Sequence, residues 1–181
     1  DQLALEQAAK GLPVVIGIPA LCFGEYDVGP STGQLITEIA KQTMPAYVRG
    51  NRSRIYTGDA ARGLVLATEK GRVGERYLFV GEDMTMDSMV QTIAQTANVP
   101  APKAAPLAAA KLINKIQTLR YKLGGPNPKV SSTAIAIMSA GQFLDGSKAE
   151  QELGFNAQTN ITDAIQKAYD WFAENGYLHR H

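Results

Sequence analysis

The chain has 181 residues, enough for one well-packed domain and too few for two independent ones. Eighteen basic and seventeen acidic side chains leave a formal charge of +1, and no run of like charges offers a surface for nucleic acid. The longest apolar run, residues 13–23, is interrupted by Gly17 and Pro19 and is shorter than the roughly 20 residues of a membrane span. We therefore expect a single globular unit with no nucleic-acid and no membrane partner.

The chain has too few cysteines and histidines for a disulfide, a metal site or a histidine-activated thiol. The single Cys22 cannot form an intramolecular disulfide, and only His179 and His181 could join it as metal ligands, so no metal site is expected. A lone thiol favours a reducing, cytosolic setting. Cys22 also has no histidine to activate it, so we expect a small buried residue rather than a nucleophile.

The first predicted elements surround a long loop. Residues 1–10 have the spacing of an amphipathic helix, and the apolar, β-branched run Pro13–Pro19 predicts a strand that is covered on both faces of a parallel sheet. Small and polar residues over 20–33 predict a long loop at the carboxyl end of that strand, where doubly wound sheets bind ligands. Ser31 and Gln34 have the spacing of a capping box for the following helix.

A β-α unit follows in the middle of the chain. Residues 54–57 indicate a short strand, and Asp59 is predicted to cap a helix that stops at Gly71. Residues 76–81 predict a second buried strand, and Thr85 is predicted to open a helix with an apolar stripe. The pattern is typical of the α/β class.

The last third of the chain is predicted to be mainly helical. An Ala- and Leu-rich helix follows Pro106, and a short helical stretch is predicted near 131–139. Ser147 and Glu150 have capping-box spacing, with Asp145 at the helix entry as a further cap. The final helix, over about 161–172, carries the most regular apolar stripe.

Several segments, taken in order, resemble the post-catalytic region of extended short-chain dehydrogenases. They are Gly11–Pro19, Phe23–Asp27, Thr32–Gly33, Met44–Val48, Gly58–Gly63, Gly74–Gly81, Asp145–Ala149, Glu152–Phe155 and Ala168–Phe172. Within that family the chain is most similar to hopanoid-associated sugar epimerases and dihydroflavonol 4-reductase-like proteins. The resemblance implies the carboxy-terminal part of a Rossmann-type parallel sheet plus a small, mostly helical substrate-binding region, with residues 1–181 as a single unit.

The resemblance also implies that catalytic and substrate-binding residues lie in different parts of the protein. The dinucleotide-binding half, with its Tyr-x-x-x-Lys catalytic pair, is expected upstream of Asp1, so this chain is expected to hold no catalytic residue and to be inactive when isolated. The implied cofactor is NAD or NADP, the implied substrate is a small molecule with a carbonyl or a secondary alcohol, and a homodimer is compatible with the family. The residues that match cofactor-contacting positions are Pro19, Ala20, Leu21 and Cys22 beside the nicotinamide, and Ser31 or Thr32 near the phosphates.

Substrate choice stays open at this point. In the long loop, Phe23 and Tyr26 are candidates for an aromatic substrate wall, and Glu25 stands where the family usually has proline. Residues 56–59 also depart from the usual valine, aspartate and histidine or arginine pattern. One alternative is a nucleotide-sugar epimerase or dehydratase that uses Arg49, Arg52 and Arg54 for a diphosphate, although a solvated loop explains these arginines equally well. Another is a non-catalytic cofactor-binding or scaffold protein.

Overall fold

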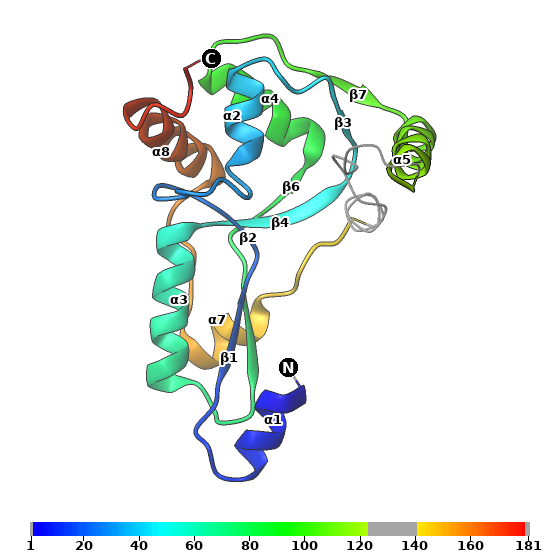
Figure 1. Cartoon of the computed structure of the whole chain (residues 1–181). Helices are drawn as coiled ribbons and strands as arrows, with labels where there is room; N and C mark the ends of the chain where they lie inside the picture. The colour runs from blue at the N-terminus through cyan, green and yellow to red at the C-terminus, as the bar shows by residue number, and fades with distance from the viewer. Residues whose placement is uncertain (1, 123–140, 180–181) are drawn as a thin grey trace.

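The computed structural model describes residues 2–122 and 141–179, and it confirms the α/β class (Figure 1). The predicted helical stretch near 131–139 lies outside these residues. The helices are α1 (Gln2–Ala9), α2 (Gln34–Ala40), α3 (Thr57–Lys70), α4 (Met86–Thr96), α5 (Leu107–Lys122), α7 (Ser147–Leu153) and α8 (Ile161–Glu174). The strands are β1 (Ile16–Pro19), β2 (Leu21–Phe23), β3 (Ala46–Val48), β4 (Asn51–Tyr56), β5 (Arg76–Phe79), β6 (Glu82–Thr85) and β7 (Lys103–Ala105).

Strands β1 and β5 form a parallel pair, as the sequence predicted, with Ile16 opposite Arg76 and Pro19 opposite Phe79. The two strands run side by side through the lower half of the molecule, with α3 and α7 beside them (Figure 1). The prediction that β1 is covered on both faces was wrong for the described chain, because all four of its residues are only half-buried. Among the described helices, α3 makes the main packing contact with β1. In addition, β1 pairs with β5 along one edge and with no other described strand.

The chain changes sheets at Ala20. The Ala20 amide still donates to the Phe79 carbonyl on β5 at 2.9 Å, but from Leu21 onward the chain pairs with β4 as the short parallel strand β2. The predicted long loop therefore begins with a strand that the sequence did not reveal. On its other side β4 pairs antiparallel with β6, and β3 and β7 form a separate parallel pair.

Two hydrophobic clusters make up the core. The upper one lies among α2, α4 and α8 and includes Ile36, Met89 and Phe172, each 1% exposed or less. The predicted stripe of α8 is confirmed, since Ile161, Ala164, Ile165, Ala168 and Phe172 are all buried. The lower cluster joins Phe79 of β5 to residues of α3 and α7.

Some predicted helix caps are confirmed. The Thr85 hydroxyl accepts from the Ser88 amide at 3.1 Å, and Asp145 accepts from the Ser147 amide at 2.9 Å. Gly154 ends α7 with a positive φ of 69°, a conformation that favours glycine.

Other predicted caps were wrong. The predicted capping box of Ser31 and Gln34 is not formed, because the N-cap residue of α2 is Gly33, which has no capping side chain. The Gly33 amide donates to the Asp27 carboxylate. The predicted capping box of Ser147 and Glu150 is also not formed, because the N-cap residue of α7 is Gly146, which has no side-chain hydrogen bond. Asp59 lies inside the first turn of α3, where it is buried rather than capping.

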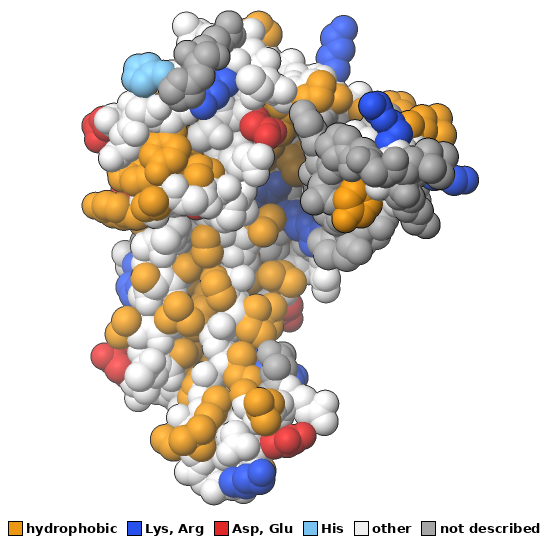
Figure 2. Space-filling model, viewed as in Figure 1, with side chains coloured by type: hydrophobic (Ala, Val, Ile, Leu, Met, Phe, Trp, Pro, Cys, Tyr) orange, Lys and Arg blue, Asp and Glu red, His pale blue; other side chains and the backbone are white. Residues whose placement is uncertain are grey.

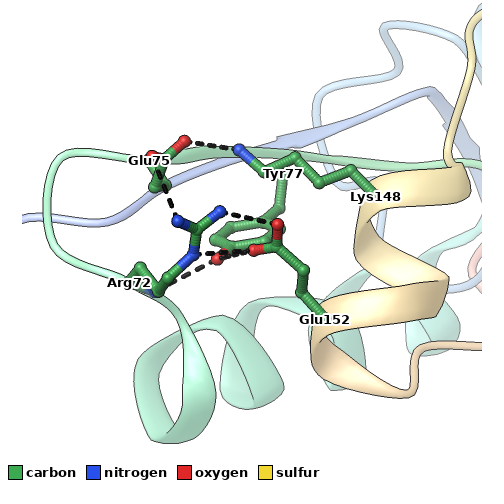
Figure 3. A network of polar contacts seen from close by, with 5 residues as sticks. All are labelled: Arg72, Glu75, Tyr77, Lys148 and Glu152. Atoms are coloured by element: carbon green, nitrogen blue, oxygen red, sulfur yellow. Dashed lines mark hydrogen bonds and ion pairs between the residues drawn. The ribbon is translucent and has the colours of Figure 1, made fainter.

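A network of polar side chains ties α7 to the amino end of β5 (Figure 3). Arg72 donates to Glu152 at 2.6 Å, and Lys148 donates to Glu75 at 2.5 Å. The fully buried Tyr77 donates its hydroxyl to Glu152 at 2.7 Å and accepts from the Arg72 backbone amide. Hydrogen bonds from the two cations lower the pKa of both carboxyls, so the network stays ionised at neutral pH.

Candidate functional site

The four residues Pro19–Cys22, which we call the strip, lie where the chain leaves β1 and enters β2. Ala20 is 6% exposed and fixed to β5 through its amide, while the Leu21 side chain is 41% exposed. The strip thus presents a neutral, largely apolar surface at the carboxyl end of a parallel strand. A surface of this kind suits one face of a flat, uncharged ring.

Cys22 is a half-buried thiol rather than an activated nucleophile. Its Sγ donates to the Ala20 carbonyl at 3.4 Å. Burial raises the pKa of the thiol, the reverse of what a reactive thiolate requires.

The segment after the strip is organised by internal hydrogen bonds. The Thr32 hydroxyl donates to the Cys22 carbonyl at 2.6 Å, and the Ser31 amide donates to Asp27 at 3.1 Å. Both residues therefore shape the loop that approaches α2. Their assignment to cofactor phosphates stays a prediction, because these donors already have acceptors within the chain.

The two predicted substrate-wall residues are not brought together. Phe23 is 4% exposed and belongs to the upper core, where Phe172 of α8 is a member of the same cluster. Tyr26 is 81% exposed, has a positive φ of 67°, and places its ring 6.0 Å from that of Trp171 on α8. The Phe23 and Tyr26 side chains therefore do not form the predicted aromatic substrate wall together.

A contact that the sequence analysis missed links the loop to β4 and α8. The Tyr56 hydroxyl donates to Glu25 at 3.3 Å, and the Lys167 ammonium of α8 lies 4.5 Å from the centre of the Tyr56 ring. Both Glu25 and Tyr56 had been noted as departures from the family pattern. Their spatial contact could not be read from positions 31 residues apart in sequence.

Asp59 makes a second link between α3 and the segment before α8. Its carboxylate accepts from the Gln158 and Thr159 amides at 3.0 and 2.9 Å, and it pairs with Arg62 at 3.0 Å. The side chain is almost fully buried, which makes these bonds structurally important. No local sequence pattern indicates partners about a hundred residues away.

Two of the three candidate arginines occupy clearly different environments. Arg54 is 1% exposed, donates to the carbonyls of Arg52 and Met84, and has its pKa lowered to about 10 by burial. Arg49 is exposed and pairs with Asp87 at 3.1 Å. The structure therefore does not present Arg49 and Arg54 as a joint surface for a diphosphate.

Comparison with known proteins gives the family. A Synechocystis sp. protein named after dihydroflavonol 4-reductase is 30% identical over 184 residues, covering 98% of this chain and 53% of the relative. The crystal structure of a nucleoside-diphosphate-sugar epimerase from Pseudomonas aeruginosa is 42% identical with a TM-score of 0.85, covering 98% of this chain and 54% of that one. These matches, each over about half of the relative, fit the extended short-chain dehydrogenase/reductase family. No family model matches it.

The short-chain dehydrogenase fold of this chain is shared with more distant structures. The dTDP-glucose 4,6-dehydratase DesIV of Streptomyces venezuelae, crystallised with NAD, is 21% identical with a TM-score of 0.71, covering 96% of this chain and 48% of that one. The chain spans about half the length of the curated relatives and solved structures that it matches. It corresponds to a Rossmann-type part of the family fold, as the sequence predicted.

The neutral surface of the strip is compatible with an uncharged ring. The Ser31 amide and the Thr32 hydroxyl, predicted near cofactor phosphates, already donate to acceptors within the chain. In the described ranges 2–122 and 141–179, no group of three or more His, Cys, Asp and Glu side chains could hold a metal ion. Among the same residues, no helix is long and apolar enough to cross a membrane.

Proposed function

We propose that this chain supplies the substrate side of an NAD(P)-dependent reductase or epimerase that acts on a carbonyl or a secondary alcohol. The observation that carries the proposal is the strip Pro19–Cys22, a neutral surface at the carboxyl end of the parallel strand β1. Ligands of open α/β sheets bind at this end of the strands. Similarity to proteins of the extended short-chain dehydrogenase family supports the same reaction class.

We further propose that residues 1–181 act as one unit that packs against a dinucleotide-binding half. Strand β1 is paired along one edge in the described chain, and α3 and the turn after it expose Leu64, Val65 and Val73. Figure 2 shows hydrophobic side chains spread over the face that carries β1 and α3. Open strand edges and extended apolar surface are unfavourable in water, which favours a covering partner segment.

The residues of the strip would orient a ring and exclude water rather than transfer protons. When bound, the nicotinamide supplies hydride exchange with the substrate carbon. Ala20 is held by β5, so the surface offered by Leu21 is fixed in place. The strip itself has no acid or base at neutral pH, since the Cys22 thiol has a raised pKa, so a group outside the strip has to supply the proton.

A nucleotide-sugar epimerase or dehydratase is the second candidate. It is favoured by the 42% identity to the Pseudomonas aeruginosa protein, which is a nucleoside-diphosphate-sugar epimerase. A nucleotide-sugar enzyme should lose affinity for its substrate when Arg49 is changed to Ala, whereas reduction of a small aldehyde should be unaffected. Dinucleotide binding without turnover of either substrate would instead favour the non-catalytic alternative.

The experiment that tests the proposal combines a fluorescence titration with NADH and NADPH and a turnover assay, each on the whole protein and on the isolated 181-residue chain. The whole protein should bind one of the two dinucleotides and turn over a carbonyl or a nucleotide sugar. The isolated chain should show no turnover. Absence of dinucleotide binding by the whole protein, or turnover by the isolated chain, would contradict the proposal.

A further inference from the structure

The Tyr56 ring, at the end of β4, fills a slot between two glycines. A Cβ atom added at Gly58 would lie 2.4 Å from Cε1 of the ring, and one added at Gly24 would lie 3.2 Å from Cε2. Phe23 and Tyr56 are also direct partners in the β2–β4 ladder. The ring is therefore held against the first residue of the loop that follows the strip.

The polar contacts of Tyr56 extend this packing to two other segments. Its hydroxyl donates to Glu25 of the loop, and Lys167 of α8 lies over its ring face at cation–π distance. Burial, followed by the hydrogen bond to Glu25, raises the pKa of Tyr56. The hydroxyl therefore keeps its proton at neutral pH and can act as the donor to the carboxylate.

Further contacts fasten the same loop to α8 and the turn after it. Tyr26 lies against Trp171, and the Tyr177 hydroxyl donates to the Val28 carbonyl at 2.8 Å. The loop Gly24–Val28 thus runs from the strip directly onto the carboxy-terminal helix.

We propose that Tyr56 is a positioning residue that, with Glu25 and Lys167, clamps the loop Gly24–Val28 and thereby fixes the strip Pro19–Cys22. The inference rests on the proposed function, which assigns the nicotinamide to the strip. It also explains two departures from the family pattern together, because the glutamate at position 25 and the tyrosine at position 56 contact each other. Loss of either side chain should loosen the same loop.

The test uses the whole protein with the variants Tyr56→Phe, Glu25→Ala and their combination. Chymotrypsin cleavage after the exposed Tyr26, followed by mass spectrometry, measures the loop without any cofactor. Each single variant should be cleaved roughly two- to tenfold faster and bind NADH or NADPH weaker by a similar factor, the range expected for one hydrogen bond. The combination should add little to Glu25→Ala, because both changes remove the same bond.

Two further variants separate positioning from a general structural effect. Glu25→Gln keeps an acceptor oxygen and should restore slow cleavage. Tyr47→Phe is the matched control, because its hydroxyl donates to Asp87 on α4 at 2.5 Å and has no contact with the loop. Tyr47→Phe should change neither the cleavage rate nor the dinucleotide affinity.

The outcomes distinguish the clamp from the proposed function. Unchanged cleavage in Tyr56→Phe, additive effects in the double variant, or faster cleavage with unchanged dinucleotide affinity would each overturn the positioning role. A wild-type protein that binds neither dinucleotide contradicts the proposed function instead. In that case the cleavage rates alone still decide whether Tyr56 and Glu25 clamp the loop.

Discussion

The two ends of the β1–β5 sheet are built from different kinds of residue. At the amino end, four charged side chains and Tyr77 hold α7 to β5 through ion pairs and hydrogen bonds (Figure 3). At the carboxyl end, the strip Pro19–Cys22 is neutral, and the Leu21 side chain is exposed. Groups that stabilise the fold are thus separated from the surface that we assign to a ligand, and substitutions at the two ends should have different effects.

The largest expected effect on stability comes from Asp59, which anchors the segment before α8. Asp59→Ala should lower the free energy of unfolding by about 3 kcal/mol, because the Gln158 and Thr159 amides lose a buried acceptor. Urea unfolding of the whole protein measures this loss. Asp59→Asn, which retains one acceptor oxygen, should lose clearly less, and equal stability of Asp59→Ala and wild type would refute the anchoring role.

Tyr77 offers a smaller change at the amino end. Tyr77→Phe keeps the buried ring but removes the bonds to Glu152 and to the Arg72 amide, so unfolding should become easier by about 1 kcal/mol. Dinucleotide affinity should stay at the wild-type value. If affinity fell together with stability, the two ends of the sheet would be coupled and the comparison would fail.

The pH dependence of stability tests the network of charged side chains at the amino end of the β1–β5 sheet. Hydrogen bonds from Lys148 and Arg72 depress the pKa of Glu75 and Glu152 in the folded state. Their stabilisation is therefore present above the unfolded glutamate pKa of about 4.3 and is lost as pH falls through the lower folded values. Thermal melts of Glu75→Gln/Glu152→Gln should decline less steeply with acidification than wild type, and a parallel decline would count against the network.

The sequence predicted the elements whose signals are local. The stripe of α8 and the Thr85 cap of α4 both depend on residues within a few positions of each other, and both are confirmed. Strand β2 was not predicted because it has only three residues. Most of β4 was not predicted because its buried positions include the polar residues Ser53 and Arg54. Polar residues in a buried strand hide the usual apolar pattern.

The candidate site was predictable only in outline. The strip followed from the apolar strand and the small residues after it, together with the family resemblance. The contact between Glu25 and Tyr56, and the bonds of Asp59, depend on segments far apart in the chain. The Asp27 carboxylate likewise accepts from the Gly33 amide, six residues later, at the start of the helix where the sequence predicted a Ser31–Gln34 capping box.

The most direct test of the account is dinucleotide binding by Leu21→Glu in the whole protein. A carboxylate in the strip should weaken the binding of NADH or NADPH at least about tenfold, which equals about 1.4 kcal/mol, because it places a charge against the uncharged reduced ring. Leu112→Glu makes the same change at an exposed position of α5, which lies apart from the strip in Figure 1, and should bind normally. Equal affinities of Leu21→Glu, Leu112→Glu and wild type would contradict the assignment of the strip to the nicotinamide.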